Sequence, residues 1–129
     1  NIDRPDRSYD IVICNHVLEH VERDKQALKE LMRITSERGF LQLSVPDPCR
    51  RQTTVDWGYP DEKQHGHYRV YGMDIENLFS QVISPEIYYQ KVYVADPVTE
   101  MQDVYFLFAR NGQVFQSIKD ACMELHNLK

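Results

Sequence analysis

The stretch YDIVICNHVLEHV, residues Tyr9–Val21, decides the fold of this chain. Its residues Ile11–Cys14 are apolar without interruption, and four polar residues follow closely: Asn15, His16, Glu19 and His20. A strand that is apolar at consecutive positions is typically buried on both faces, as in a parallel sheet covered by helices. In such sheets ligands bind outside the carboxyl ends of the strands. We therefore predict an inner parallel strand over Ile11–Cys14 whose tip carries the chemistry.

The following residues predict further helices and strands. Apolar residues at helical spacing predict a helix over 24–34, with Asp24 as its N-cap, and Gly39 provides a stop after it. Alternating apolar residues predict a strand over 40–45, which Pro46 ends. The remaining elements are expected at 74–82 (helix), 87–94 and 103–110 (strands joined through Pro97) and 113–128 (a C-terminal helix). One side of the last helix carries Val114, Phe115, Ile118, Ala121, Cys122, Leu125 and Leu128.

Residues 46–72 contain several prolines and glycines and little periodicity, so we expect a long loop there. The segment concentrates aromatic and cationic side chains: Trp57, Tyr59, His65, His67, Tyr68, Arg69 and Tyr71. A substrate lid and a mobile surface loop both agree with this composition.

Composition limits the class of protein. A chain of 129 residues forms a single domain with a real core, and its net charge of −5 with scattered basic residues argues against nucleic-acid binding. Three cysteines without a C-x-x-C pair indicate reduced thiols and a cytoplasmic protein. The sequence contains neither a signal peptide nor a long apolar segment, so we expect no membrane association.

Three segments resemble the second half of class I S-adenosylmethionine (SAM)-dependent methyltransferases, of the type 11 small-molecule group: YDIVICNHVLEHV, DKQALKELMRITSERGFLQLSVP and HGHYRVYGMDIENLFSQ. The resemblance implies an α/β fold, a partial Rossmann-like sheet with flanking helices. Its strands would follow the family order 4-5-7-6, with the last strand of the chain antiparallel. The C-terminal helix would be an addition to the family's fold.

The resemblance also implies a site. Asn15, His16, Val17 and Glu19 would contact SAM, and His16 or His20 would act as the base. The acceptor would be a small molecule, contacted by residues of the 46–72 segment: Trp57, His65, His67, Tyr68, Arg69 and Tyr71. Other interpretations remain open, because Glu19 also suits the start of the next helix and His20 suits a packed position. No Cys pair or H-E-x-x-H motif supports a metal site, and His16 and His20 share a face only if the segment is helical, so we expect no metal.

The sequence departs from the family in one respect. Its glycines, Gly39, Gly58, Gly66, Gly72 and Gly112, form no G-x-G turn, and the acidic residue that holds the cofactor ribose is missing. We therefore expect a truncated methyltransferase that is inactive alone as an enzyme. The alternative is a non-catalytic remnant or interaction module that needs a partner to complete its sheet. In either case the unpaired edge Tyr9–Asn15 predicts a homodimer.

Overall fold

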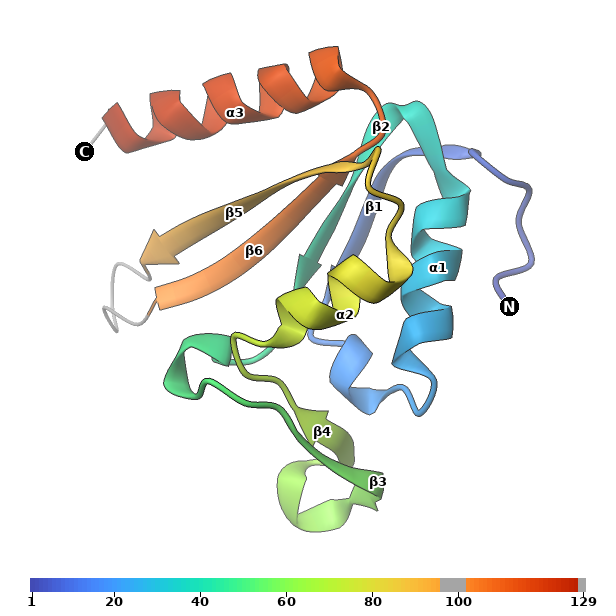
Figure 1. Ribbon diagram of the computed structural model, residues 1–129, viewed down its shortest axis with the longest axis vertical. Coiled ribbons are helices and arrows are strands. Elements are labelled where there is room, and N and C mark those ends of the chain that lie inside the picture. Colours follow the sequence, from blue (N-terminus) through green and yellow to red (C-terminus); the bar gives the residue numbers. More distant parts are fainter. Residues whose placement is uncertain (96–101, 128–129) are drawn as a thin grey trace.

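The computed structural model describes residues 1–95 and 102–127, without the side chains of 102 and 125–127. The main sheet of this part of the chain contains β1 (Tyr9–Asn15), β2 (Thr35–Ser44), β6 (Gln102–Ala109) and β5 (Tyr88–Ala95), in that spatial order (Figure 1). β1 and β2 are parallel, whereas β6 runs antiparallel to both of its neighbours. This arrangement confirms the predicted α/β fold and its strand order 4-5-7-6.

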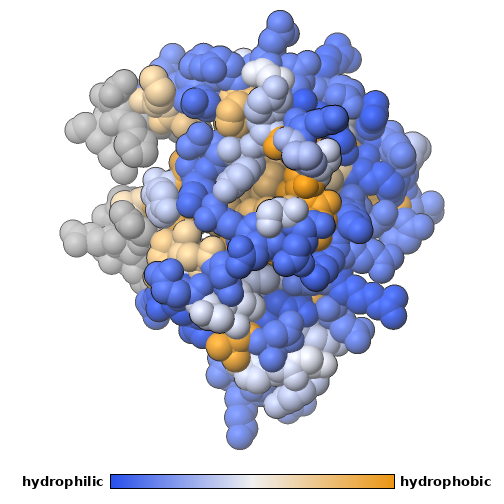
Figure 2. Space-filling view, in the orientation of Figure 1, coloured by the Kyte–Doolittle hydropathy of each residue, from blue (hydrophilic) through white to orange (hydrophobic). Residues whose placement is uncertain are grey.

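Two helices cover one face of the sheet, α1 (Asp24–Ile34) and α2 (Ile75–Val82) (Figure 1). Apolar side chains that alternate along the strands meet these helices, and the core consists mainly of Leu28, Met32, Leu41, Leu43, Ile75, Leu78, Phe79, Phe106 and Phe108. The surface on this side is mostly hydrophilic, with hydrophobic residues visible near its centre (Figure 2). One buried layer between helices and sheet therefore stabilises the domain.

The C-terminal helix α3 (Gly112–Asn127) confirms the prediction of a helix there. Phe115 stacks on Tyr88 of β5 with the ring centroids 5.2 Å apart. Successive side chains of a strand point to opposite faces of the sheet, so Tyr88 and Tyr89 face opposite sides. Tyr89 donates a hydrogen bond to Glu76 of α2, which places Tyr89 on the face that α1 and α2 cover. Tyr88, and with it α3, therefore lies on the other face. Pro97, the side chain of Leu125, and Leu128 lie outside the described residues.

β1 corrects the prediction of a strand buried on both faces. Val12 and Cys14 are 7% and 5% exposed beneath the helices, but Ile11 and Ile13 are 59% and 62% exposed on the other face. β1 is also the edge of the sheet, because only β2 pairs with it among the described residues. The apolar run therefore pairs with β2 along one edge only. Among the described residues no strand pairs with its other edge, and no element covers Ile11 and Ile13 on the outer face.

The segment 46–72 corrects the prediction of a long irregular loop. It contains an antiparallel pair, β3 (Val55–Asp61) and β4 (His67–Val70), which projects from the main body (Figure 1). The chain reverses through His65 and Gly66, with φ of 58° and 76°, the left-handed region that glycine adopts at little cost. The base of this hairpin is held by Asp74, whose Oδ1 accepts hydrogen bonds from Thr54 N and Oγ1 at 2.8 and 2.6 Å.

Gly39 lies within β2 rather than at a helix stop. β2 begins directly after α1, at Thr35, five residues earlier than the alternation predicted. A Cβ at Gly39 would collide with the backbone of Asp10, so this glycine permits the close approach of β1 and β2.

None of the helices in the described part of the chain has the length and hydrophobicity needed to cross a membrane.

Candidate functional site

The carboxyl tip of β1 presents the first part of the site. Asn15 pairs with Ser44, so the parallel strands β1 and β2 end at the same edge of the sheet. His16 then turns the chain with a φ of 51°, and its N–H donates to the Ser44 carbonyl at 3.0 Å. A left-handed conformation at a residue other than glycine costs about 1 kcal/mol, and such residues often cluster at functional sites. Asn15, His16 and Val17 are all exposed at this tip.

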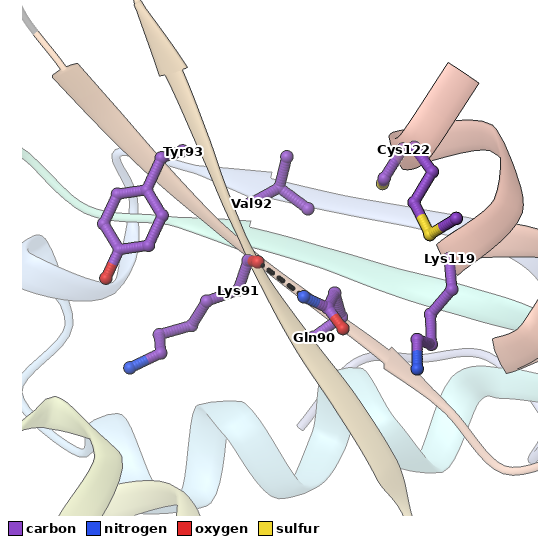
Figure 3. Close-up of a pocket in the computed structure, with 7 residues that line it drawn as sticks. Gln90, Lys91, Val92, Tyr93, Lys119 and Cys122 are labelled. Atoms are coloured by element: carbon purple, nitrogen blue, oxygen red, sulfur yellow. Dashed lines mark hydrogen bonds between the residues drawn. The ribbon is translucent and has the colours of Figure 1, made fainter. Parts of the chain in front are cut away.

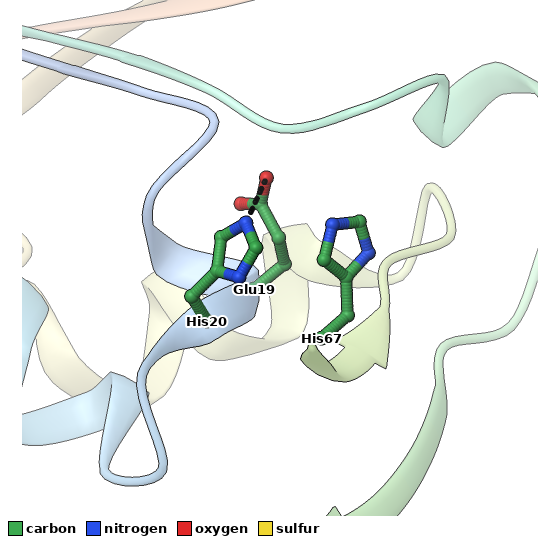
Figure 4. A group of neighbouring side chains, drawn as sticks. All are labelled: Glu19, His20 and His67. Carbon is green, nitrogen blue, oxygen red and sulfur yellow. Dashed lines mark ion pairs between the residues drawn. The ribbon is translucent and has the colours of Figure 1, made fainter. Parts of the chain in front are cut away.

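Glu19 lies directly behind the tip, in a short 3-10 helix, Leu18–His20. It is only 1% exposed, and neither carboxylate oxygen has a hydrogen-bond partner among the described residues. The imidazole of His20 lies beside it, with Nε2 4.0 Å from Oε1 (Figure 4). A buried carboxylate without hydrogen bonds is costly, because desolvation penalises its charge. Buried carboxylates in proteins are normally hydrogen-bonded, paired with a cation or bound to a metal ion.

The hairpin brings a second histidine to Glu19 and His20. His67 of β4 packs edge-on against His20, with ring centroids 4.5 Å apart and planes at 89° (Figure 4). Burial lowers the pKa of His67, the neighbouring His20 lowers it further, and Glu19 acts in the opposite direction. His65, at the hairpin turn, has its ring 6.1 Å from that of His67. Residues from two distant segments thus form one polar group.

Arg69 and Tyr71 were predicted to contact substrate, but the structure places them in packing roles. Arg69 is 4% exposed and donates to the carbonyls of Val21 and Glu22 at 2.5 and 2.9 Å, and to Asp56 Oδ2 at 2.7 Å. Tyr71 is buried and donates to Asp24 Oδ2 at 2.8 Å. Burial raises the pKa of Tyr71, and the adjacent Asp24 raises it further. Both side chains join the hairpin to the turn before α1, so their polar atoms are already bonded within the protein.

The other predicted substrate-contacting residues are divided by the hairpin. Tyr68 lies on the opposite side of β4 from His67 and Arg69, because side chains alternate along a strand. Trp57 directly follows Asp56, which pairs with Arg69, and it lies where the register of the strand pair shifts. Of the six residues, His67 lies against His20, and the ring of His65 lies 6.1 Å from that of His67.

The sequence did not reveal the grouping of Glu19, His20 and His67. Glu19 and His20 were candidates through the segment after β1, but His67 belongs to a hairpin that was predicted as a loop. The sequence feature that could have indicated it is the spacing of His67 and Arg69, because alternate residues of an extended strand lie on the same side. That signal required the strand to be recognised first.

Two hollows lie outside this group. One of about 450 Å³ follows α1 and is lined in part by Cys14, Val17 and Leu18, so it begins beside the strand tip. Another, of about 520 Å³, lies between β5 and α3, with Gln90, Lys119 and Cys122 in its wall (Figure 3). Burial raises the pKa of the Cys122 thiol. The second hollow is on the far side of the sheet from the Glu19 group and shares no residue with it.

Known proteins show what this architecture is similar to. The chain matches the model of a methyltransferase domain family over residues 1–82. Its structure is similar to that of a SAM-dependent methyltransferase from Thermotoga maritima, with a TM-score of 0.57 and 18% identity over 85% of this chain and 59% of that one. A SAM-dependent methyltransferase from Archaeoglobus fulgidus has a TM-score of 0.50 and 12% identity, over 81% of this chain and 60% of that one.

The chain thus spans about three fifths of the length of these two solved structures, and no curated protein matches it. The likeness to them shows the fold, which agrees with the strand order and with the position of the helices. The family model covers well over half of the chain. The chain therefore belongs to the methyltransferase domain family.

Proposed function

We propose that this chain forms the acceptor side of a SAM-dependent methyltransferase that acts on a small molecule. The observation that carries the proposal is the tip of β1, where exposed Asn15 and His16 lie at the carboxyl edge of a sheet with the family's strand order. Ligands of open α/β sheets bind at this edge. The imidazoles of His20 and His67 lie close behind it and would face the acceptor side.

The residues present fit one part of SAM. Asn15, His16 and Val17 are exposed at the strand tip and would contact its methionine end. Glu19 is buried, so a direct contact with the cofactor's amino group is less favoured than its contact with His20. No G-x-G turn occurs among the five glycines, so a backbone cradle for the rest of the cofactor must come from outside these residues. We therefore infer weak or no SAM binding by the 129-residue chain alone.

When bound, SAM supplies a methyl group on a sulfonium sulfur. The protein's own contribution is mainly to hold the acceptor in line, which can lower a barrier by roughly 7–11 kcal/mol. A histidine that takes the acceptor's proton adds about two to four orders of magnitude. His16 and His20 are the candidates, because both are exposed near the tip. His16 is the stronger one, since it directly follows the last residue of β1, at the strand tip where ligands of such sheets bind.

Calorimetric titration with S-adenosylhomocysteine tests this proposal. The 129-residue chain should bind it weakly or not at all, whereas the complete natural reading frame that contains these residues should bind with micromolar affinity. His16→Ala in that longer protein should lower methyl transfer from SAM by at least about tenfold. An unchanged rate, or no binding by the longer protein, would contradict the methyltransferase assignment.

The exposed edge of β1 favours a second candidate function, an interaction module. An apolar edge strand with unpaired backbone groups is a template for pairing with another strand. We propose that two copies of the 129-residue chain pair through Tyr9–Asn15, which would give a twofold dimer with one continuous sheet. A stable dimer without any affinity for S-adenosylhomocysteine would favour this function, whereas a monomer at micromolar concentration would exclude it.

We also infer that the protein works in the cytoplasm. Cys14, Cys49 and Cys122 are free thiols, and Cys14 is buried in the core, where it serves as a small apolar residue. Proteins of reducing compartments keep such thiols unpaired. Fractionation of the native cells with an antibody to this chain would test the inference.

A further inference from the structure

We propose that Glu19, His20 and His67 form a binding site for a divalent transition-metal ion, with Zn²⁺ as the best match. One ligand atom from each residue lies within 4.8 Å of the other two (Figure 4). The three come from the turn after β1 and from β4, which the fold brings together. This site is separate from the cofactor contacts proposed at Asn15, His16 and Val17. It shares His20 with the two candidate bases, so a metal-bound His20 would leave His16 as the base.

The buried carboxylate is the first argument for a cation. Both oxygens of Glu19 lack a hydrogen-bond partner among the described residues, and no lysine or arginine pairs with it there. Buried charges in proteins are normally paired or bind a metal ion. A cation between Glu19 and the two imidazoles would satisfy this carboxylate.

The second argument is the chemistry of the ligands. Two imidazoles and one carboxylate are a common ligand set of Zn²⁺, with a water molecule in the fourth position. Mg²⁺ and Ca²⁺ prefer oxygen ligands, so two nitrogen donors select against them. Ligands at about 2.0–2.1 Å from a tetrahedral Zn²⁺ lie roughly 3.3 Å apart. The present separations therefore require the side chains to converge by about 1 Å or somewhat more.

The third argument is the way in which the hairpin is held. Arg69, two residues after His67, donates hydrogen bonds to the carbonyls of Val21 and Glu22, which directly follow His20. This buried contact fixes β4 against the turn that carries Glu19 and His20. Sites are most effective when rigid contacts position their ligands. His20 is half-exposed, so an ion could enter from solvent on its side.

The test uses the 129-residue chain after removal of metal with a chelator. Wild-type protein should bind one Zn²⁺ in calorimetry, and Zn²⁺ should raise its melting temperature, since a ligand that binds only the folded state stabilises it. Glu19→Gln and His67→Asn should each lower the Zn²⁺ affinity by at least about tenfold. Co²⁺ should give the absorption of a four-coordinate nitrogen and oxygen site, without a thiolate band.

Two matched controls define the result. Glu22→Gln removes an exposed carboxylate from the same turn, and Cys49→Ser removes an exposed thiol that could bind Zn²⁺; both should bind Zn²⁺ as the wild type does. Equal affinities in wild type, Glu19→Gln and His67→Asn would overturn the proposal, as would the absence of a Zn²⁺-induced rise in melting temperature. If Glu19→Gln fails to fold, the Co²⁺ spectrum of His67→Asn decides, because His67 lies on the hairpin outside the main core. Retention of that spectrum would overturn the site.

Discussion

Arg69 is the residue on which the position of the hairpin depends most. Its buried guanidinium contacts three segments, through Asp56 of β3, Asp24 at the start of α1, and the carbonyls of Val21 and Glu22. Because these contacts leave Arg69 few polar atoms for a ligand, we expect its role to be structural. An arginine in a polar segment has the same appearance in a sequence whether it binds a substrate or three carbonyls, so this role could not be predicted.

We expect Arg69→Met to lower the free energy of unfolding by about 2–4 kcal/mol, because it leaves the carbonyls of Val21 and Glu22 without this donor and removes the ion pair with Asp56. Urea denaturation measures the loss. Arg38→Met, an exposed arginine in β2, is the matched control and should change stability by no more than about 0.5 kcal/mol. Equal effects of the two substitutions would show that the Arg69 contacts contribute little.

Elements were predicted well where the signal was local. The helix at 24–34 and the strands at 87–94 and 103–110 follow from short apolar patterns, and the structure places α1, β5 and β6 within one residue of them at each end. The hairpin at 46–72 was missed because its strands are mostly exposed and two positive-φ turns interrupt them, so no apolar alternation marks them. The exposed face of β1 was missed because a run of apolar residues indicates that burial is favourable. It does not show that another element is present to cover both faces.

α1 also holds the N-terminal segment, through a pair whose strength should depend on pH. Arg33 donates hydrogen bonds to the carbonyls of Ile2 and Arg4. The carboxylate of Glu30 accepts hydrogen bonds from the Arg33 side chain and from the N–H of Ile2. The hydrogen bond from Arg33, and then that from Ile2, lower the pKa of Glu30 to about 2. A carboxyl with a lowered pKa in the folded state stabilises it above the ordinary pKa of about 4.5.

We therefore expect this contribution to be complete at neutral pH and to be lost as the pH falls from about 4.5 towards 2. Urea denaturation at a series of pH values should show a smaller decrease in stability for Glu30→Gln than for wild type over this range. Glu86→Gln, at an exposed glutamate in the turn before β5, should follow the wild-type curve. A Glu30→Gln curve parallel to that of wild type would show that the contact is not made in solution.

Near β1, one face of the sheet is covered by helices, and the other face is open in the part of the chain that the structure describes. Ile11 pairs with Phe40 and Ile13 with Gln42, whose own partner in β6 is Leu107. Paired residues share a face, so these side chains form a continuous, largely apolar surface beside an unpaired edge. Surfaces of this kind on soluble proteins usually mark an interaction site.

A charge on the open face should prevent this association without unfolding the domain. Ile13→Lys places an ammonium group at a position that is 62% exposed, so the monomer loses little packing, whereas a dimer paired through β1 would bring two like charges close together on the same sheet face. Sedimentation at micromolar concentration should give a dimer for wild type and a monomer for Ile13→Lys, with melting temperatures of the monomeric states within a few degrees. Tyr59→Lys, at an exposed aromatic residue of the hairpin, should remain dimeric. A dimer that survives Ile13→Lys but dissociates in Tyr59→Lys would place the contact on the hairpin, and the free edge of β1 would then need another explanation.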